Sequence, residues 1–365
     1  MAVELGIVGL PNVGKSTLFN ALTKAHALVA NYPFTTIEPN VGVVAVPDER
    51  LGQIAAIVRP EKVTPSSMRL VDIAGLVKGA SSGEGLGNQF LGHIRNVDAV
   101  AMLIRTFRDP DVPHVTPELD PVADVATVNL ELILADLATV DRALATARDA
   151  SKGKPVERGA STAPLDSLLA HLNSGLAARM LSRTSDEWVA ASALNLLTAK
   201  PVLYVANVGE ADLPDGGEMV GLLRHHLEPE GAELLIICAQ CESELADWPP
   251  ADAQAYLQEL GLSELGVHRF VRAGYQLLNL ITFFTSTGGK EVRAWPLARG
   301  TTVLEAAGSI HSDMERGFIR AEVVSYQDLT RTGSLAAARD SGLLRIEGRD
   351  YVVQDGDVIH IRFNV

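Results

Sequence analysis

Residues 5–19 read Leu-Gly-Ile-Val-Gly-Leu-Pro-Asn-Val-Gly-Lys-Ser-Thr-Leu-Phe, and this stretch decides the fold. Its first apolar run, residues 5–8, has the length and composition of a short buried strand. Apolar residues then recur at helical spacing, at Leu18, Phe19 and Leu22. The sequence therefore predicts a strand, a loop and a helix in direct succession.

The loop between this strand and helix carries the full phosphate-binding pattern, Gly9-x-x-x-x-Gly14-Lys15-Ser16. The glycines let the backbone curl until successive N–H groups point at the phosphates, and the positive end of the helix faces the same charge. We expect Lys15 to reach the β- and γ-phosphates and the Ser16 hydroxyl to bind magnesium. The alternative is a chance match in a glycine-rich turn, but the strand before it and the helix after it favour a site for a nucleoside triphosphate.

Length, charge and cysteine content limit the class of protein. A chain of 365 residues is long enough for two or three domains, each with its own core. The net charge of -14 argues against a protein that coats nucleic acid by bulk electrostatics, although it leaves room for a local basic face. Two cysteines cannot form a disulfide framework. With no run of membrane-spanning length and no room for a leader before Gly9, we expect a cytoplasmic protein without a membrane partner.

Further apolar runs have the composition of buried strands. They are residues 42–46, 68–73, 99–104, 201–207 and 234–237. The alternation of strands and helices pauses after about residue 107 and resumes near residue 200. We therefore predict a discontinuous P-loop NTPase G domain, residues 1–121 and 200–279, built on a doubly wound and mainly parallel α/β sheet.

The interval 122–199 has helical periodicity on both sides of a polar linker at 151–164. It predicts an inserted helical hairpin, either a structural arm or a lever that binds a partner. From about residue 280 the pattern changes to short strands, among them 292–295, 321–324, 351–353 and 358–363, with a helix near 302–310 and a tight turn at Asp355-Gly356. Residues 280–365 are therefore predicted to form a small α+β module.

Two later segments are typical of a nucleotide switch. Asp72 ends its strand and is followed by Ile-Ala-Gly75, which places a carboxylate beside the magnesium shell and a flexible backbone N–H near the γ-phosphate. Thr35 and Thr36, in a Pro-rich loop, are candidates for the hydroxyl that completes the metal shell, although either residue alone also suits a cap or a turn. The order and spacing of these motifs favour a switch over a kinase.

Together, the motifs Gly9-Leu-Pro-Asn-Val-Gly-Lys-Ser-Thr17, Tyr32-Pro-Phe-Thr-Thr36, Asp72-Ile-Ala-Gly-Leu-Val-Lys-Gly-Ala-Ser81 and Gln354-Asp-Gly-Asp-Val resemble the YchF family of Obg-like ATPases. The second motif alone also fits Obg GTPases, whereas residues 300–319 and 351–365 favour YchF. The resemblance covers essentially the whole chain and implies a helical insertion and a C-terminal TGS domain. It implies Ser16 and Thr36 as magnesium ligands and a phosphate cradle formed by Asn12, Val13, Gly14, Lys15, Ser16 and Thr17. It also implies the ribosome, as its large subunit or the whole particle, as a partner, with RNA contacts through the TGS and helical domains.

The base-reading position holds Asn207-Val-Gly-Glu210 where GTPases carry Asn-Lys-x-Asp. Val208 replaces the lysine that stacks on guanine, and Glu210 is one methylene longer than aspartate, so its carboxylate crowds the position of the guanine amino group. Adenine lacks that group and offers exocyclic amino hydrogens instead, so hydrogen-bond matching favours ATP over GTP. A loop with Asn and Glu by chance is the alternative. The resemblance agrees with ATP.

Cys238-x-x-Cys241 follows the last predicted strand of the sheet and has three interpretations. Its spacing fits a redox pair or half of a zinc site. The same segment occupies the last nucleotide loop of this fold, where backbone near Ala239 is expected to contact the base. We favour this last role, because no convincing further zinc ligands are near in sequence.

Hydrolysis has to proceed without the glutamine that orients the attacking water in Ras-like switches, because Leu76 stands in its place. His114 lies in a Pro-rich loop and is one candidate to replace it. The resemblance favours this role, although most lone loop histidines are solvated and inert. A potassium ion held by Asn12 is the other candidate. We expect Lys15 and His114 as catalytic residues of a slow ATP hydrolase that a partner accelerates.

The sequence thus predicts a Mg²⁺-dependent ATPase of the YchF type that acts as a ribosome-associated switch, with K⁺ as a second candidate ion. A GTPase in ribosome assembly is the first alternative. The second is a nucleotide-gated protein that binds the ribosome or RNA with negligible turnover.

Overall fold

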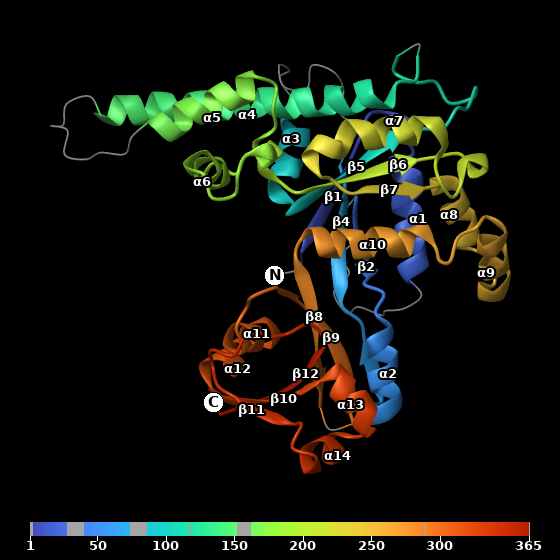
Figure 1. Cartoon of the computed structure of the whole chain (residues 1–365), viewed down its shortest axis with the longest axis vertical. Helices are drawn as coiled ribbons and strands as arrows, with labels where there is room; N and C mark the ends of the chain where they lie inside the picture. Colours follow the sequence, from blue (N-terminus) through green and yellow to red (C-terminus); the bar gives the residue numbers. More distant parts are fainter. Residues whose placement is uncertain are drawn as a thin grey trace.

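The computed structural model describes residues 3–27, 40–73, 86–116, 118–151, 162–287 and 289–364. Two six-stranded sheets organise these residues along the long axis of the molecule (Figure 1). The predicted switch residues Thr35, Thr36 and Leu76 lie outside the described residues, as does most of the predicted linker at 151–164.

The first sheet has the strand order β2-β4-β1-β5-β6-β7. Its strands are β1 (Glu4–Val8), β2 (Val41–Ala45), β4 (Ser67–Asp72), β5 (Ala99–Arg105), β6 (Val202–Asn207) and β7 (Leu234–Ile237). All pair in parallel except β2, which runs antiparallel to β4. Every residue of β5 and β6 is buried, as expected for continuous apolar runs at the centre of a sheet covered on both faces. This confirms the predicted mainly parallel, doubly wound α/β sheet.

Helices cover both faces of this sheet (Figure 1). One face carries α1 (Lys15–Ala27) and α10 (Gly266–Leu277), which contact each other, and α8 (Ala239–Leu245), which packs on α1. The other face carries α4 (Pro121–Ser151) and α7 (Gly217–Leu227). The helix α3 (Leu86–Asn96) buries Phe90, Leu91 and Ile94 in the same core, whereas α9 (Pro250–Glu259) packs in a small separate cluster. The apolar core runs continuously through the strands and these inner helices.

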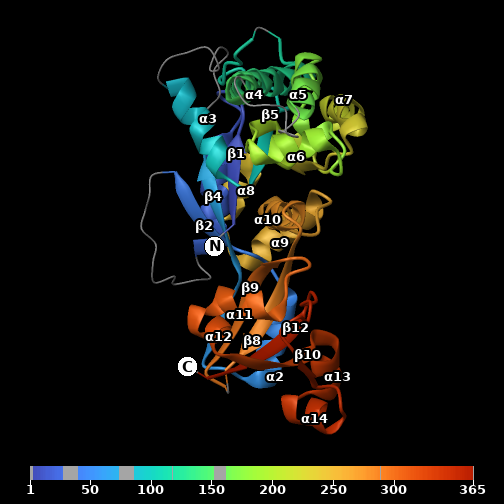
Figure 2. The same ribbon diagram turned by 90° about the vertical axis from the view of Figure 1, so that its left-hand side faces the viewer.

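The chain between β5 and β6 forms a helical arm, which Figures 1 and 2 show across one end of the molecule. Its first two helices, α4 and α5 (Ala163–Asn173), pack side by side, as predicted. The expected continuous helical pattern from 165 to 197 is interrupted, however, because α6 (Asp186–Ala193) starts afresh after Ser185, whose side chain accepts from the Trp188 N–H. Two 3₁₀ turns, η1 (Ala178–Met180) and η2 (Leu197–Ala199), flank it. In η1, the Arg179 guanidinium donates a hydrogen bond to the hydroxyl of Tyr204 in β6 at 2.9 Å, which connects the arm to the first sheet.

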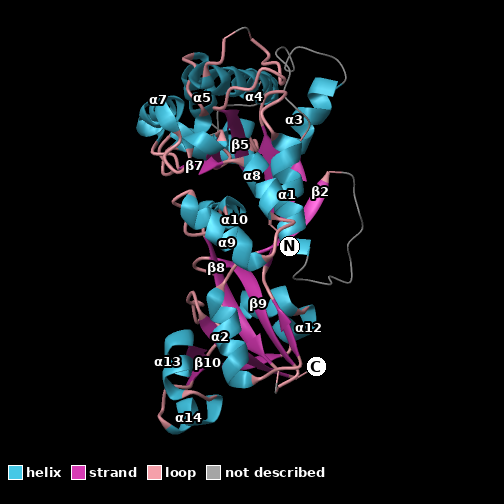
Figure 3. Cartoon of the chain, turned by 90° about the vertical axis from the view of Figure 1, so that its right-hand side faces the viewer, coloured by secondary structure: helices cyan, strands magenta, loops and turns pink. Residues whose placement is uncertain are grey.

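The second sheet has the order β11-β10-β12-β8-β9-β3 and mixed pairing. Its strands are β3 (Lys62–Thr64), β8 (Leu280–Ser286), β9 (Glu291–Ala298), β10 (Phe318–Ser325), β11 (Arg345–Glu347) and β12 (Asp357–Phe363). Its helices are α2 (Glu49–Val58), α11 (Val303–Ile310), α12 (Ser312–Arg316), α13 (Tyr326–Thr332) and α14 (Leu335–Asp340). Figure 3 shows β8 and β9 leading from α10 into this sheet. The predicted α+β module is confirmed in fold class.

Two details of this module differ from prediction. Residues 49–64, assigned above to the first domain, form α2 and β3 of the second sheet, where β3 pairs with β9 in parallel. An ion pair at 2.9 Å between Arg50 and Asp355 fastens α2 to the turn before β12. The predicted strand 351–353 is wrong, because only Val352 makes an isolated bridge, to Thr302.

Among the residues that the structure describes, none of the helices combines the length and apolar content needed to cross a membrane.

Candidate nucleotide-binding site

A pocket of about 750 Å³ opens at the carboxyl ends of five parallel strands of the first sheet. Residues that follow or end these strands line it: Asn12 after β1, Asp72 in β4, Phe107 after β5, Val208 after β6 and Cys238 after β7. Ligands of open α/β sheets bind at this edge. The pocket is therefore the candidate site.

All predicted nucleotide-binding residues except Val13 line the pocket. They are Asn12, Gly14, Lys15, Ser16, Thr17, Asn207, Val208, Glu210 and Ala239. The Val13 side chain is buried in the core, so only its backbone can take part in a phosphate cradle.

The two glycines of the phosphate loop are required by close approach. A Cβ on Gly9 would lie 2.5 Å from the Leu103 carbonyl oxygen, and a Cβ on Gly14 would lie 2.4 Å from the Asn207 amide nitrogen. Gly14 also has φ +93°, which side chains disfavour. The loop thus has the tight curl that the motif predicts.

Lys15 closes this loop from inside. Its Nζ donates to the carbonyl oxygens of Gly9 and Leu10, at 3.0 and 2.9 Å. Burial lowers the pKa of Lys15, and the nearby Asp72 carboxylate opposes that shift. The ammonium therefore lies in the phosphate loop, where a polyphosphate chain offers it better acceptors than two carbonyls.

Asn207 joins two loops of the pocket. Its amide Nδ2 donates to the Val13 carbonyl at 2.9 Å, and its Oδ1 accepts from the Ala239 N–H at 2.9 Å. The side chain thus holds the phosphate loop against the loop after β7. The Asn207 amide can reach the Val13 carbonyl because the neighbouring Gly14 has no Cβ to block it.

At the other end of the pocket, Glu210 is already engaged by a residue that sequence reasoning missed. The Tyr256 hydroxyl donates to Glu210 Oε1 at 2.7 Å, and this hydrogen bond raises the pKa of the Tyr256 phenol to about 12. The other oxygen, Oε2, lies 4.0 Å from Cys241 Sγ. Val208 is buried beneath this end of the pocket, and its N–H donates to the Ile237 carbonyl.

Asp72 and Ser16, which the sequence predicts as magnesium ligands, both line the pocket, as does Lys15. Asp72 Oδ1 is buried without a hydrogen-bond partner among the described residues, and burial raises the pKa of this carboxyl against the effect of Lys15. An orphaned carboxylate oxygen beside a hydroxyl suits a hard cation that also binds substrate phosphates. Thr36, the third expected ligand, lies outside the described residues. No cluster of three or more His, Cys, Asp or Glu ligands occurs in the described part of the chain.

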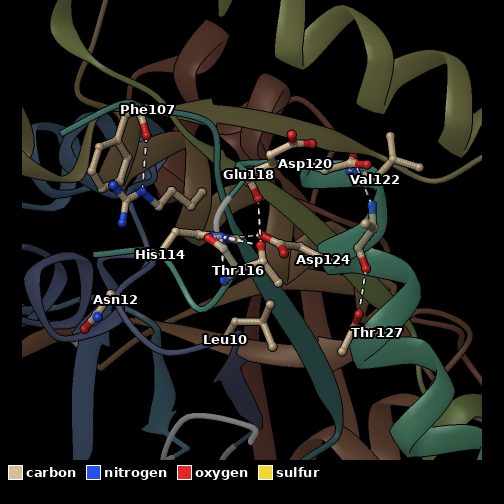
Figure 4. Close-up of polar contacts among 12 residues, drawn as sticks. Leu10, Asn12, Phe107, His114, Thr116, Glu118, Asp120, Val122, Asp124 and Thr127 are labelled. Carbon is tan, nitrogen blue, oxygen red and sulfur yellow. Dashed lines mark hydrogen bonds and ion pairs between the residues drawn. The ribbon is translucent and has the colours of Figure 1, made fainter. Parts of the chain in front are cut away.

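His114 does not line the pocket but is held beside it (Figure 4). Its Nε2 lies 3.0 Å from Asp124 Oδ2, and its Nδ1 lies 2.8 Å from Thr116 Oγ1. Only 8% of each side chain of the His114–Asp124 pair is exposed. Asp124 belongs to the first turn of α4, so this contact joins the histidine to the helical arm.

The loop that carries His114 is tied to the phosphate loop. The Asn12 side-chain amide donates to the carbonyl of Pro113 at 3.0 Å. The guanidinium of Arg105, stacked 4.5 Å from the centre of the Phe107 ring, donates to the carbonyls of Val112 and Asp109 at 2.8 and 3.3 Å. The Asn12 side chain thus connects the phosphate loop to the residue before His114.

Sequence reasoning missed Phe107, Asp124 and Tyr256. Phe107 directly follows β5, and the carboxyl-end rule was a signal that could have found it. Asp124 and Tyr256 were missed because their contacts, with His114 and with Glu210, form only in the folded chain and have no local sequence pattern.

Comparisons with known proteins agree with this geometry. A family model described as "50S ribosome-binding GTPase" matches residues 4–146. A second, named YchF-GTPase_C and described as a "Protein of unknown function (DUF933)", matches residues 280–364.

Curated relatives match over the full length of both chains. The chain is 49% identical to the "Ribosome-binding ATPase YchF" of Bacillus subtilis and 46% identical to that of Escherichia coli O157:H7, with 100% of each chain covered. The solved "Structure of the Schizosaccharomyces pombe YchF GTPase" is 34% identical, with a TM-score of 0.89, and the match covers 99% of this chain and 97% of that one.

Proposed function

The chain belongs to the YchF family, and from this premise we propose that it is a magnesium-dependent ATPase acting as a ribosome-associated switch in the cytoplasm. The observation that carries the proposal is one pocket with a lysine-closed phosphate loop at one end and the Glu210–Tyr256 pair at the other. Its volume of about 750 Å³ and the chemistry of its lining suit a purine nucleoside triphosphate with the phosphates at Lys15 and the base at Glu210.

The Glu210–Tyr256 pair supports ATP over GTP. Guanine presents two adjacent N–H donors to the carboxylate of a base-reading loop, and a good match needs both oxygens. In this chain the Tyr256 hydroxyl already donates to Oε1 at 2.7 Å, so Oε2 is the oxygen left fully open to the base. Adenine can donate one amino N–H to that oxygen, whereas guanine needs both oxygens for its two adjacent donors, so GTP is matched less well than ATP.

Tyr256→Phe is expected to lower the ratio of ATP to GTP affinity by about fivefold, because freeing one carboxylate oxygen restores roughly one hydrogen bond to guanine. The Tyr256 ring, which packs on Trp248 in a tilted arrangement with centroids 5.4 Å apart, is retained in this variant. Nucleotide titrations with Tyr326→Phe, at the start of α13 (Tyr326–Thr332) in the C-terminal module, provide the matched control. An unchanged ratio in Tyr256→Phe would exclude Tyr256 from base selection.

Magnesium would be held by Asp72, Ser16 and Thr36 together with phosphate oxygens of the nucleotide. When bound, the ion supplies positive charge that neutralises the phosphates. Lys15 contributes a second positive charge from the protein itself. The unpartnered Asp72 Oδ1 supports this assignment.

We infer that His114 is stored in an inactive position and orients the attacking water only after release. Both of its ring nitrogens face oxygen atoms of Thr116 and Asp124 rather than the pocket. A bound nucleotide that draws Asn12 away from the Pro113 carbonyl removes one contact of the loop that carries His114. A partner that moves α4 withdraws Asp124 from His114 and so removes the second contact. While His114 is held by Asp124 and Thr116, intrinsic hydrolysis is slow. A partner that releases His114 accelerates it.

Potassium is the alternative means of replacing the missing glutamine, held by Asn12 in the wall of the pocket. Exchanging sodium for potassium at constant ionic strength is then expected to raise ATP turnover by about tenfold, because a fixed positive charge stabilises the charge that develops on the phosphates. The same exchange should have no effect on Asn12→Ala. Equal rates of phosphate release in the two salts would eliminate the ion.

The partner is proposed to be the ribosome, as the names of the relatives indicate for those proteins, with its large subunit or the whole particle as the contact. RNA contacts through the helical arm and the TGS-type module are part of this proposal. Phosphate release from ATP and from GTP, each with and without ribosomes, tests the function. We expect phosphate release to be faster from ATP than from GTP and to be accelerated by ribosomes. Equal release from GTP would favour the GTPase alternative. Negligible release under every condition would favour a nucleotide-gated binding protein.

A further inference from the structure

The only two cysteines of the chain lie side by side in the wall of the nucleotide pocket. Cys238 Sγ and Cys241 Sγ are 2.7 Å apart, and both thiols are free. Both side chains are largely buried from bulk solvent, and both line the pocket, which gives a small molecule access to them. Neither the phosphate loop nor the proposed base selection requires a thiol at either position.

The surroundings make the two thiols unequal. The Cys241 thiol donates a hydrogen bond to Cys238 Sγ, which also accepts from the Cys241 backbone N–H at 3.4 Å. These hydrogen bonds lower the pKa of Cys238, and the same thiol contact, with burial, raises the pKa of Cys241. Cys238 is therefore the nucleophile of the pair, and Cys241 the thiol that resolves its oxidation.

We propose that Cys238 and Cys241 form a reversible oxidation site whose disulfide weakens nucleotide binding in the same pocket. The oxidant is a hydroperoxide such as hydrogen peroxide. Cys238 thiolate attacks one peroxide oxygen, breaks the O–O bond and becomes a sulfenic acid, while the other oxygen leaves as water after protonation. The Cys241 sulfur then attacks Cys238 Sγ, the S–O bond breaks and a second water leaves. The two sulfurs together lose two electrons to the peroxide, and a dithiol reductant reverses the change by exchange.

The position of the pair explains why the bridge affects the nucleotide. A disulfide requires an S–S distance of about 2.05 Å, so the sulfurs must approach each other, and we expect this to strain the turn at Ala239 and Gln240 between them. Ala239 is the residue that Asn207 fastens to the phosphate loop, and both intervening residues line the pocket. Cys241 Sγ also lies 4.0 Å from Glu210 Oε2, so a displacement of this sulfur changes the surroundings of the base-reading carboxylate.

Coupling of this kind is reciprocal. If the disulfide lowers nucleotide affinity, bound nucleotide must oppose disulfide formation by the same factor. We expect a factor of about fivefold or more, as is typical of linked sites within one domain. The inference rests on the proposed function only for the identity of the ligand, since bridge formation itself is measured by mass.

The test treats the full-length protein with hydrogen peroxide, with and without ATP, and measures intact mass and ATP affinity. The expected product is a monomer lighter by two hydrogen atoms, with ATP affinity at least about fivefold lower and restored by dithiothreitol. ATP present during oxidation should slow formation of the bridge. If the reduced protein does not bind ATP, the proposed function is contradicted. If the disulfide still forms in that protein, the proposed oxidation of Cys238 and Cys241 is supported independently of the nucleotide.

Cys238→Ser and Cys241→Ser are the matched controls, because neither can lose two hydrogens. Each is expected to lack the dithiothreitol-reversible bridge, and Cys241→Ser is expected to stop at the addition of one oxygen to Cys238. Addition of oxygen to both thiols of the parent protein without bridging would overturn the proposal. A complete bridge with unchanged ATP affinity would overturn it equally.

Discussion

Lys15→Ala is expected to lower ATP turnover by about 100- to 1,000-fold, the usual effect of removing a preorganised positive group from a transition state in which charge develops. In the structure Nζ is held by the carbonyls of Gly9 and Leu10, so the ammonium is already in place before phosphates arrive. The Lys15 ammonium interacts with the negative charge of the bound phosphates as well as with that of the transition state, so the ATP affinity of Lys15→Ala should also fall. Steady-state phosphate release and nucleotide titration measure the two effects separately.

Lys24→Ala is the matched control for this variant. Lys24 lies on the same helix, α1, but its side chain is 53% exposed and pairs with Asp247 at 3.1 Å, away from the pocket. Its turnover should equal that of the parent protein, since an exposed ion pair contributes little. Turnover of Lys15→Ala within a few-fold of the parent would contradict the assignment of the phosphate loop.

His114→Ala is expected to lower ribosome-stimulated ATP turnover by about 100-fold or more, the usual contribution of a side chain that transfers or orients a proton in the reaction. Its ATP affinity should change little, because His114 does not line the pocket. The variant separates the two explanations of hydrolysis without glutamine. Unchanged turnover would remove His114 from the mechanism and leave potassium as the remaining candidate.

Asp124→Ala gives the complementary result. If Asp124 stores the histidine, its removal should raise the basal rate and reduce the further acceleration by ribosomes. His225→Ala is the control, because this side chain is 88% exposed on α7. A folded Asp124→Ala protein with turnover as low as that of His114→Ala would show instead that Asp124 positions the active histidine.

The sequence predicts most accurately the features that are local. The turn from β1 into α1 is encoded within residues 9–16, because the glycines, Lys15 and Ser16 act within one loop. The buried strands were found because long apolar runs at the centre of a sheet leave a direct signal. Residues 49–64 were predicted as part of the first domain, and the pairing of β3 with the second sheet was not foreseen, because it depends on β9, more than two hundred residues later.

The same distinction applies to the site. Glu210 could be assigned to base reading from its place after β6, but its contact with Tyr256 joins α9 to the base loop and has no sequence signature. His114 could be singled out, yet its storage on Asp124 depends on where α4 enters the fold. Asn207 was predicted to meet the nucleotide, and its bracing of Val13 against Ala239 emerges only when both loops are placed.

Calorimetric titration of the purified, folded chain with magnesium-ATP and with magnesium-GTP is the sharpest test of ATP recognition by this pocket. We expect one ATP site whose affinity for ATP is at least about tenfold higher than for GTP, since the wrong base leaves polar hydrogens unpaired. Absence of heat with magnesium-ATP, or equal affinity for the two nucleotides, would contradict it.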